Sequence, residues 1–468
     1  MAARTIDASR ARRVAAVVAL TVFVSGCAAV GPNYKRPDVA HPAQYRFAAT
    51  PSDAATLADL PWWQVFEDAT LQALIREAVA NNLDLRAAAA RVEQARAQAG
   101  IAKSFLYPQV DGVASYTAQQ NSGTDGGEAQ QAAVYGFQLS WEIDLFGRLR
   151  REREAAVATM LATEEGRRGV LVTLVGDVAS TYFLLRELDV ELAIAKRTLG
   201  VNDETVTFFQ NRVNGGVSNQ LELERVSAFR SETAAAIPDL ERQIALTENA
   251  LSLLLGRVPG PIAREGIADL PLQPPIPPGL PASLLERRPD VLQAEQLLIA
   301  ANANIGAAKA LFFPAVSLTG FAGGISGDLA TLLGGAGAVW QAVPALAQPV
   351  FNAGRLRRNV EAARANYDEA LARYQKSALN GYREVANALV TIQKLAESRG
   401  QRQAGVAALR SAADLSRVRY ESGLASYIEI LTADQDLFAQ QLRLAETQGA
   451  ELRARAELYR ALGGGWQP

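Results

Sequence analysis

Apolar and polar residues alternate strictly in one stretch of the first third of the chain. Between residues 135 and 145, the odd positions are aromatic or aliphatic and the even positions are polar or glycine. The preceding segment 110–119 alternates in a similar way, and the turn-forming residues 121–127 separate the two. A period of two on both sides of a turn predicts a β-hairpin, at about 108–146, with one apolar face and one polar face.

Each arm of this hairpin has about the ten residues that a tilted strand needs to cross a bilayer. A half-buried hairpin of a soluble domain would show the same alternation. A second, weaker hairpin is predicted at about 314–351, where Val316 and Leu318 alternate with Ser317 and Thr319 and Pro344 lies in the last arm. Two matched hairpins favour a membrane sheet over the soluble alternative.

A helical pattern runs from about 148 to 213 without a proline, which corresponds to a rod of about 100 Å. Its apolar positions step alternately by three and four residues, as in a coiled coil. They are Leu171, Leu174, Val178, Thr181, Leu185, Leu188, Leu192, Ala195 and Leu199, and the seam continues to Val206, Phe209 and Val213. A return helix is predicted at about 218–255, and Pro238 predicts a kink or a break in it.

The plan occurs twice along the chain. Pro108 and Pro314 are 206 positions apart, and Gly147 and Gly354, each before an Arg-Leu-Arg-Arg run, are 207 apart. A fixed period over such a length indicates a duplicated unit. The predicted organisation begins with a cleaved segment 1–26 and an extended segment 27–67. A first repeat, 68–256, is joined by a proline-rich linker, 257–281, to a second repeat, 282–463, and a tail, 464–468, follows. The second repeat is predicted to contain a long helix at about 355–421 and a return helix at about 425–462.

The first 26 residues have the features of an export signal. Four arginines precede an apolar run that is too short for a stable membrane span. The run ends in Val24-Ser-Gly-Cys27, which resembles the lipobox of bacterial lipoproteins. That resemblance implies diacylglycerol on the thiol of Cys27 and an acyl chain on its amine, and Ala28 implies sorting to the outer membrane.

Composition argues against several function classes. The formal net charge is −2, which gives no indication of nucleic-acid binding. The chain has one cysteine, Cys27, and one histidine, His41, so neither a zinc site nor a histidine-based catalytic centre is expected. No nucleotide-binding loop is apparent. We therefore predict a protein that is not an enzyme and has no cofactor or metal.

Two hairpins supply only four strands, which cannot close a barrel. In lipid, an open sheet edge would leave backbone hydrogen-bonding groups unsatisfied. The barrel is therefore expected to be shared between several chains.

A set of motifs in a fixed order identifies a resemblance. It comprises the lipobox, Tyr34-Lys-Arg-Pro37, Trp62-Trp-x-x-Phe66, Asp144-Leu-Phe-Gly-Arg148 and Pro314-x-Val-x-Leu-Thr-Gly320, together with the duplicated helix-hairpin-helix plan. The mature chain resembles the TolC-like outer-membrane efflux proteins, and within them the OprM-type lipoprotein branch of tripartite systems with an RND pump.

The resemblance implies a mainly α-helical fold with a membrane β part. Three identical chains would share a twelve-stranded barrel in the outer membrane and a long periplasmic coiled-coil barrel. A periplasmic adaptor and an inner-membrane pump, of RND type, would be the partners. The implied function is passive export of drugs and toxic small molecules, with the protein lipid-anchored in the outer membrane of a Gram-negative cell.

In that family the channel narrows close to two helix turns at the adaptor end, here 214–218 with Gly215 and Gly216, and 422–426 with Gly423. Tyr420 matches a tyrosine of the family's gate. The family's gate arginine falls on Ala425, and its two aspartates fall on Glu429 and Thr432, so this gate departs from the family pattern. The acids near the turns are Glu222, Glu224, Glu429, Asp434 and Asp436. Each is a gate candidate or, alternatively, part of a solvated helix face.

Three other functions remain as alternatives. The chain could form the exit duct of a type I protein secretion system, a lipoprotein rod that does not conduct, or a diffusion porin. The alternating hairpins argue against a rod, and a porin does not require about 100 Å of coiled coil.

Overall fold

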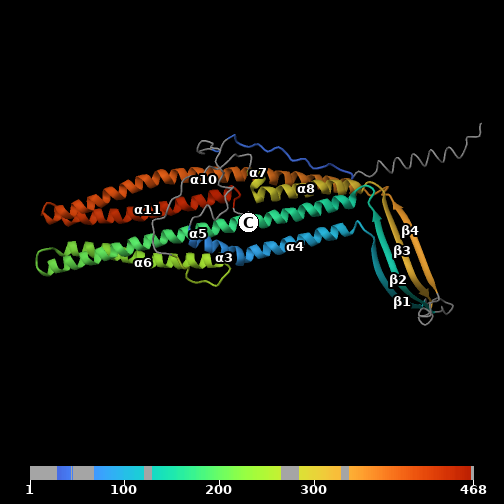
Figure 1. The fold of residues 1–468 in the computed structure, drawn as a ribbon, viewed down its shortest axis with the longest axis horizontal. Coiled ribbons are helices and arrows are strands. Elements are labelled where there is room, and N and C mark those ends of the chain that lie inside the picture. Colours follow the sequence, from blue (N-terminus) through green and yellow to red (C-terminus); the bar gives the residue numbers. More distant parts are fainter. Residues whose placement is uncertain are drawn as a thin grey trace, which may run out of the picture. The chain divides into compact units, whose positions relative to one another are not determined.

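A computed structural model of the chain describes residues 29–43, 45, 68–120, 129–264, 284–327 and 337–464. Cys27, Trp62 and Trp63 lie outside these residues. Elements are labelled as in Figure 1. In chain order they are α3 Ala69–Asn81, α4 Leu83–Ser104, β1 Gln109–Gln120, β2 Ala129–Ile143, α5 Arg148–Asn214, α6 Gln220–Leu254, α7 Leu284–Arg287, α8 Pro289–Ala310, β3 Ala315–Ser326, β4 Ala338–Ala347, α10 Arg355–Glu421 and α11 Tyr427–Ala461.

The duplication extends to the lengths of the helices. Helices α4 and α8 each have 22 residues, α5 and α10 each have 67, and α6 and α11 each have 35. Helix α6 continues through Pro238, so the break predicted there as one alternative is wrong. A proline removes one backbone hydrogen bond, and the packed face of a 35-residue helix can compensate for that loss.

The chain divides into two compact units, and neither unit coincides with a repeat. The first unit comprises residues 1–38, 90–164 and 293–375, and the second comprises 39–89, 165–292 and 376–468. Each unit therefore contains segments of both repeats. A repeat cannot bury its apolar surface alone, so it packs against the other copy.

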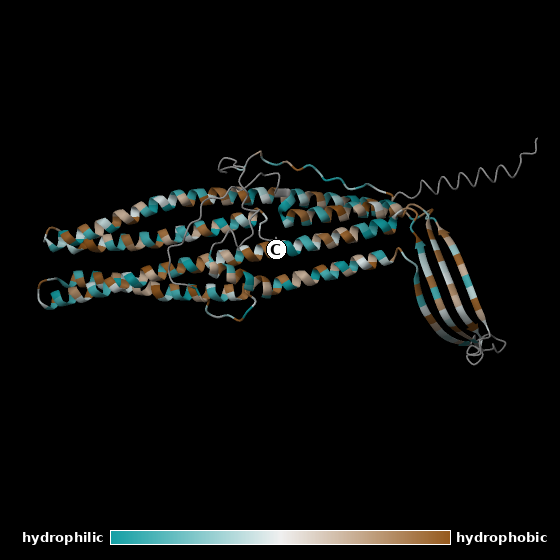
Figure 2. Ribbon diagram, viewed as in Figure 1, coloured by the Kyte–Doolittle hydropathy of each residue, from teal (hydrophilic) through white to brown (hydrophobic). Residues whose placement is uncertain are grey.

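The first unit contains one antiparallel sheet in the order β1-β2-β3-β4, which Figure 1 shows with the strands side by side. Phe137 pairs with Ala322 and Leu318 pairs with Pro344, so the second hairpin is formed despite its proline. Pro344 lies on β4, an edge strand, where a missing N–H is tolerated. Apolar and polar residues alternate along the strands in Figure 2. Phe137 is 66% exposed and Trp340 is 82% exposed, so apolar surface remains uncovered on the sheet.

A second feature of the first unit is the segment from Val30 to Arg36, which is held by hydrogen bonds to residues of both repeats. The Val30 N–H donates to the Phe146 carbonyl at 3.0 Å, and the Asn302 amide donates to the Pro32 carbonyl at 2.9 Å. The Arg36 guanidinium forms a fork to Glu295, with distances of 2.8 and 2.6 Å. The residues that follow the predicted lipid anchor thus contact both repeats.

The second unit contains the main core. Tyr182 of α5 is fully buried, and its hydroxyl donates to Asp68 at 2.7 Å. Asp68 also caps α3 by accepting from the Leu71 N–H. Apolar side chains of α3, α5, α6, α10 and α11 meet around Tyr182, among them Ile75, Leu251, Val385 and Tyr459. Helix α5 is buried on more than the seam predicted for it, because it packs against several helices rather than one.

Candidate functional site

The two helix turns of the second unit have the same backbone conformation. Gly216 has φ +71° and Gly423 has φ +72°, the left-handed region that glycine enters without strain. The N–H of Val217 returns to the Arg212 carbonyl at 2.9 Å, and the N–H of Leu424 returns to the Arg419 carbonyl at 2.8 Å. Gly215 is outside the left-handed region, so only the second glycine of that pair is required by the turn.

An arginine at the end of each long helix also closes its turn. Arg212 donates from Nη2 to the Val217 carbonyl at 3.4 Å, and Arg419 donates to the Leu424 carbonyl at 3.5 Å. A basic side chain that binds the carbonyls at the end of a helix stabilises that end.

Aromatic side chains of both repeats meet behind the turns. Phe209 of α5 is fully buried, and its ring centroid lies 4.2 Å from that of Tyr427. Tyr420 is half-buried, and its ring lies 5.7 Å from that of Tyr427. This tip cluster also contains Leu223, Val226, Phe229, Ile430 and Leu431. Burial raises the pKa of Tyr427 well above its usual range, so its hydroxyl stays protonated.

Tyr420, one of the predicted gate residues, also contacts a cation of the other repeat. The Arg212 guanidinium carbon lies 5.9 Å from the Tyr420 ring centroid and 5.4 Å from that of Phe208. The Nε of Arg212 is buried without a hydrogen-bond partner among the described residues. This contact between a cation and two rings connects α5 with α10 beside the turns.

The predicted acids differ in their surroundings. Glu429 and Arg419 form an ion pair at 3.3 Å on a half-exposed surface. Glu222 accepts from the Ser218 hydroxyl and Glu224 accepts from the Gln220 amide, so both are bound within their own turn. Asp436 is exposed and has no ion pair in the part of the chain that the structure describes.

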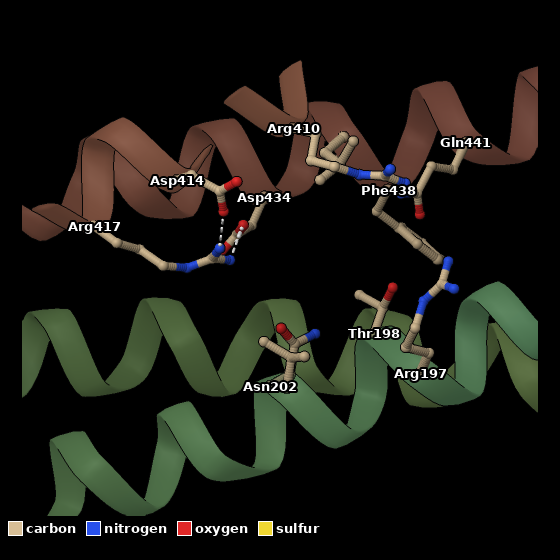
Figure 3. Close-up of a pocket in the computed structure, with 11 residues that line it drawn as sticks. Arg197, Thr198, Asn202, Arg410, Asp414, Arg417, Asp434, Phe438 and Gln441 are labelled. Atoms are coloured by element: carbon tan, nitrogen blue, oxygen red, sulfur yellow. Dashed lines mark hydrogen bonds and ion pairs between the residues drawn. The ribbon is translucent and has the colours of Figure 1, made fainter. Parts of the chain in front are cut away.

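Asp434 lies in a different environment from the other four acids. Its side chain is 17% exposed and forms an ion pair with Arg417 at 2.7 Å. Burial raises its pKa, and the Arg417 guanidinium opposes that shift. Figure 3 places this pair at one end of a cleft between α5 and the α10–α11 pair. The structure therefore brings Tyr420 and Glu429 to the turns, whereas Asp434 lies in the cleft and shares Arg417 with Asp414.

Within the described residues, no group of three or more histidine, cysteine, aspartate or glutamate side chains could hold a metal ion.

Comparison with known proteins identifies relatives over nearly the whole chain. The sequence model described as outer membrane efflux protein matches residues 74–257 and 280–464, one segment in each repeat. The cation efflux system protein CusC of Escherichia coli O6:H1 is 35% identical over 453 residues, covering 96% of this chain and 98% of CusC. The solvent efflux pump outer membrane protein SrpC of Pseudomonas putida is 34% identical, with 95% and 97% covered.

Solved structures show the same fold. The outer-membrane channel OprN has a TM-score of 0.87 and 32% identity, with 94% of this chain and 100% of that chain covered.

Proposed function

Because the chain belongs to the outer membrane efflux protein family, we propose that it is the outer-membrane channel of a tripartite efflux system and passively exports drugs and toxic small molecules. The family match over both repeats is the observation that carries this proposal. The relatives are named for cation and solvent efflux, so their names span different cargoes. A periplasmic adaptor and an inner-membrane pump of RND type would supply the cargo and the energy.

We further propose that three copies assemble into one channel. The sheet has two open edges, β1 and β4, and unpaired edge groups are costly in lipid. Pairing β4 of one copy with β1 of the next would remove every edge and form a barrel of twelve strands. The exposed apolar residues on the strands, such as Phe137 and Trp340, would then face lipid.

Cys27 is proposed as the lipid anchor. It lies outside the described residues, and the support is its signal sequence together with the fastened segment from Val30 to Arg36. Mass spectrometry of the N-terminal peptide tests this proposal: the expected peptide begins at Cys27 and carries three acyl chains. A peptide that begins at Met1 without lipid contradicts it.

The gate is proposed at the two helix turns. In this proposal the contact of Arg212 with Tyr420 holds the two repeats together, and the channel opens when α10 moves away from α5. Glu429 of three copies would form a ring of carboxylates that attracts cations. Glu222, Glu224, Asp434 and Asp436 remain weaker candidates, since the first three already have partners within the chain.

The test of channel function is planar-bilayer conductance of the purified protein, with its assembly mass measured on the same sample. We expect a trimer that gives small, rarely open steps with a preference for cations. A folded monomer without conductance would overturn both the shared barrel and the channel.

The test of the gate is Glu429→Gln in the same recordings. We expect cation preference to fall, because the substitution removes three negative charges from the ring in a trimer. Glu397→Gln, at an exposed carboxylate of α10 that pairs with Lys394, is the matched control. Equal selectivity in wild type and Glu429→Gln would remove Glu429 from the gate.

A further inference from the structure

A cleft of about 340 Å³ lies in the second unit between α5 of the first repeat and α10 and α11 of the second. Arg197 and Asn202 line it from α5, Arg410 and Arg417 from α10, and Phe438 and Gln441 from α11 (Figure 3). Its volume falls within the range of small-molecule sites in proteins.

The charges of the cleft are not balanced. Its two carboxylates, Asp414 and Asp434, both accept from Arg417, at 3.0 and 2.7 Å. The remaining cations, Arg197 and Arg410, have no ion pair or hydrogen bond with any described residue. Two guanidinium groups therefore have no carboxylate partner among the described residues, and the five charged side chains of the cleft sum to +1.

The two free arginines approach the same apolar surface. In Figure 3 the Arg410 side chain lies on one side of Phe438 and the Arg197 side chain extends toward it from α5. Leu437 and Val201 also line the cleft, and Gln441 adds an amide group. A guanidinium group binds a carboxylate through paired hydrogen bonds, and an adjacent ring favours an apolar group on the same ligand.

We propose that this cleft binds a small organic carboxylate with an apolar or aromatic body. Its carboxylate accepts hydrogen bonds from Arg197 and Arg410, and its body lies against Phe438. Such a ligand joins α5 to the α10–α11 pair and so links the two repeats. The site is independent of the proposed channel function, because binding requires neither conduction nor a partner protein.

The test uses 4-fluorobenzoate as the probe, titrated into the purified full chain in detergent and followed by fluorine NMR. Two further probes isolate the contribution of the ligand's negative charge: fluorobenzene has no charge, and 4-fluorobenzylamine has a positive charge. We expect saturable binding of 4-fluorobenzoate and no saturable binding of the other two probes. Signals from detergent without protein are subtracted for each probe.

Substitutions locate the site. Arg197→Gln and Arg410→Gln are each expected to weaken 4-fluorobenzoate binding about tenfold, the value of one hydrogen bond to a charged group. The double variant is expected to lose saturable binding. Arg225→Gln on α6 is the control, because Arg225 is exposed and has no ion pair among the described residues. Both cleft arginines are exposed, so the variants should keep the wild-type melting temperature and assembly mass.

Three results would overturn the site. One is the absence of saturable 4-fluorobenzoate binding to wild type, as expected if a neighbouring copy covers the cleft. Another is full binding by the folded double variant. The third is equal affinity for fluorobenzene, which would leave an apolar cleft without carboxylate recognition. Conductance on the same sample separates these results from a failure of the channel proposal.

Discussion

The two helix turns share a backbone and differ in what holds them. Both close on a glycine with positive φ and on an arginine five residues before the carbonyl that it binds. Arg212 of the first turn contacts Tyr420 of the other repeat, whereas Arg419 of the second turn pairs with Glu429 of its own repeat. Duplication therefore preserved the turn, and divergence of the side chains directed the arginine of one turn to the other repeat and the arginine of the other turn to an acid of its own repeat.

The same divergence appears further along the long helices. Glu187 and Glu191 of α5 are buried, and Glu187 pairs with Arg453 of α11. The positions 207 residues later are Lys394 and Ser398, and Lys394 forms an exposed pair with Glu397. Helix α5 buries acids where its copy α10 exposes a cation. The asymmetry identifies α5 as the central helix of the second unit.

The largest expected effect comes from Phe209→Ala. Phe209 is fully buried and has Ser416 as its counterpart in the second repeat, so the first repeat alone supplies this ring. Removing it from the tip cluster should destabilise that end by about 3–5 kcal/mol. Hydrogen exchange over α5, α6 and the turn measures the loss. Phe208→Ala, at a ring that is 47% exposed, should cost much less, and equal losses would contradict the proposed role of burial.

The next effect concerns pH and the acids of α5. Burial first, and then the nearby charges of Glu187 and Glu446, raises the pKa of Glu191 to about 7, and Arg453 opposes this shift. A raised pKa means that the folded state keeps a proton that the unfolded state releases. Stability should therefore fall as pH rises from the ordinary range of a glutamate, near 4.5, to about 7, and stay level above that.

Glu191→Gln should reduce this pH dependence and raise stability at pH 8 by about 2 kcal/mol, allowing for solvent screening. Melting curves at pH 5 and pH 8 measure it. Glu397→Gln on the second repeat should leave the difference between the two pH values unchanged. A wild type that is more stable at pH 8 than at pH 5, with the variant unaltered, would contradict the assignment.

Substitution of the left-handed glycine should reduce stability by the same amount in both turns. Gly216→Val and Gly423→Val each place a β-branched residue in the left-handed region and should cost about 1–2 kcal/mol. A Cβ at either glycine would have nothing within 4 Å, so the cost is conformational rather than steric. Gly215→Ala provides the control, because its φ is not positive. Thermal unfolding compares the three variants, and unequal costs at positions 216 and 423 would show that the turns are not equivalent.

The smallest expected effect is the difference in stability between variants of Arg212 and Arg419, the two arginines at the turns. Arg212→Gln should lose the contact with two rings, about 1 kcal/mol, and should increase the fraction of time that the channel is open. Arg419→Gln should change stability by less than about 0.5 kcal/mol, because an ion pair with half-exposed partners contributes little. Bilayer recordings and melting curves test both. An equal increase in opening for the two variants would remove the distinction between the turns.

The elements of the fold could be predicted because their signals are local. A period of two from residue 135 to 145 and a three-four seam through Leu174, Val178 and Leu185 each reflect side chains on one face of one element. Repetition at 207 residues then supported the weaker hairpin that contains Pro344. The resemblance to the efflux family rested on short motifs in order, which the comparison confirmed over both repeats.

Tertiary structure decided which side chains of the two repeats meet. Nothing in the spacing of Arg212 indicates that it lies beside Tyr420, more than 200 residues later, or that Arg417 forms an ion pair with Asp434. Likewise, the burial of Glu191 and the free arginines of the cleft depend on how α5 packs against α10 and α11. Periodicity determines the face of a helix that is buried, whereas ion pairs and pKa values depend on the distance to groups that only the folded chain brings close.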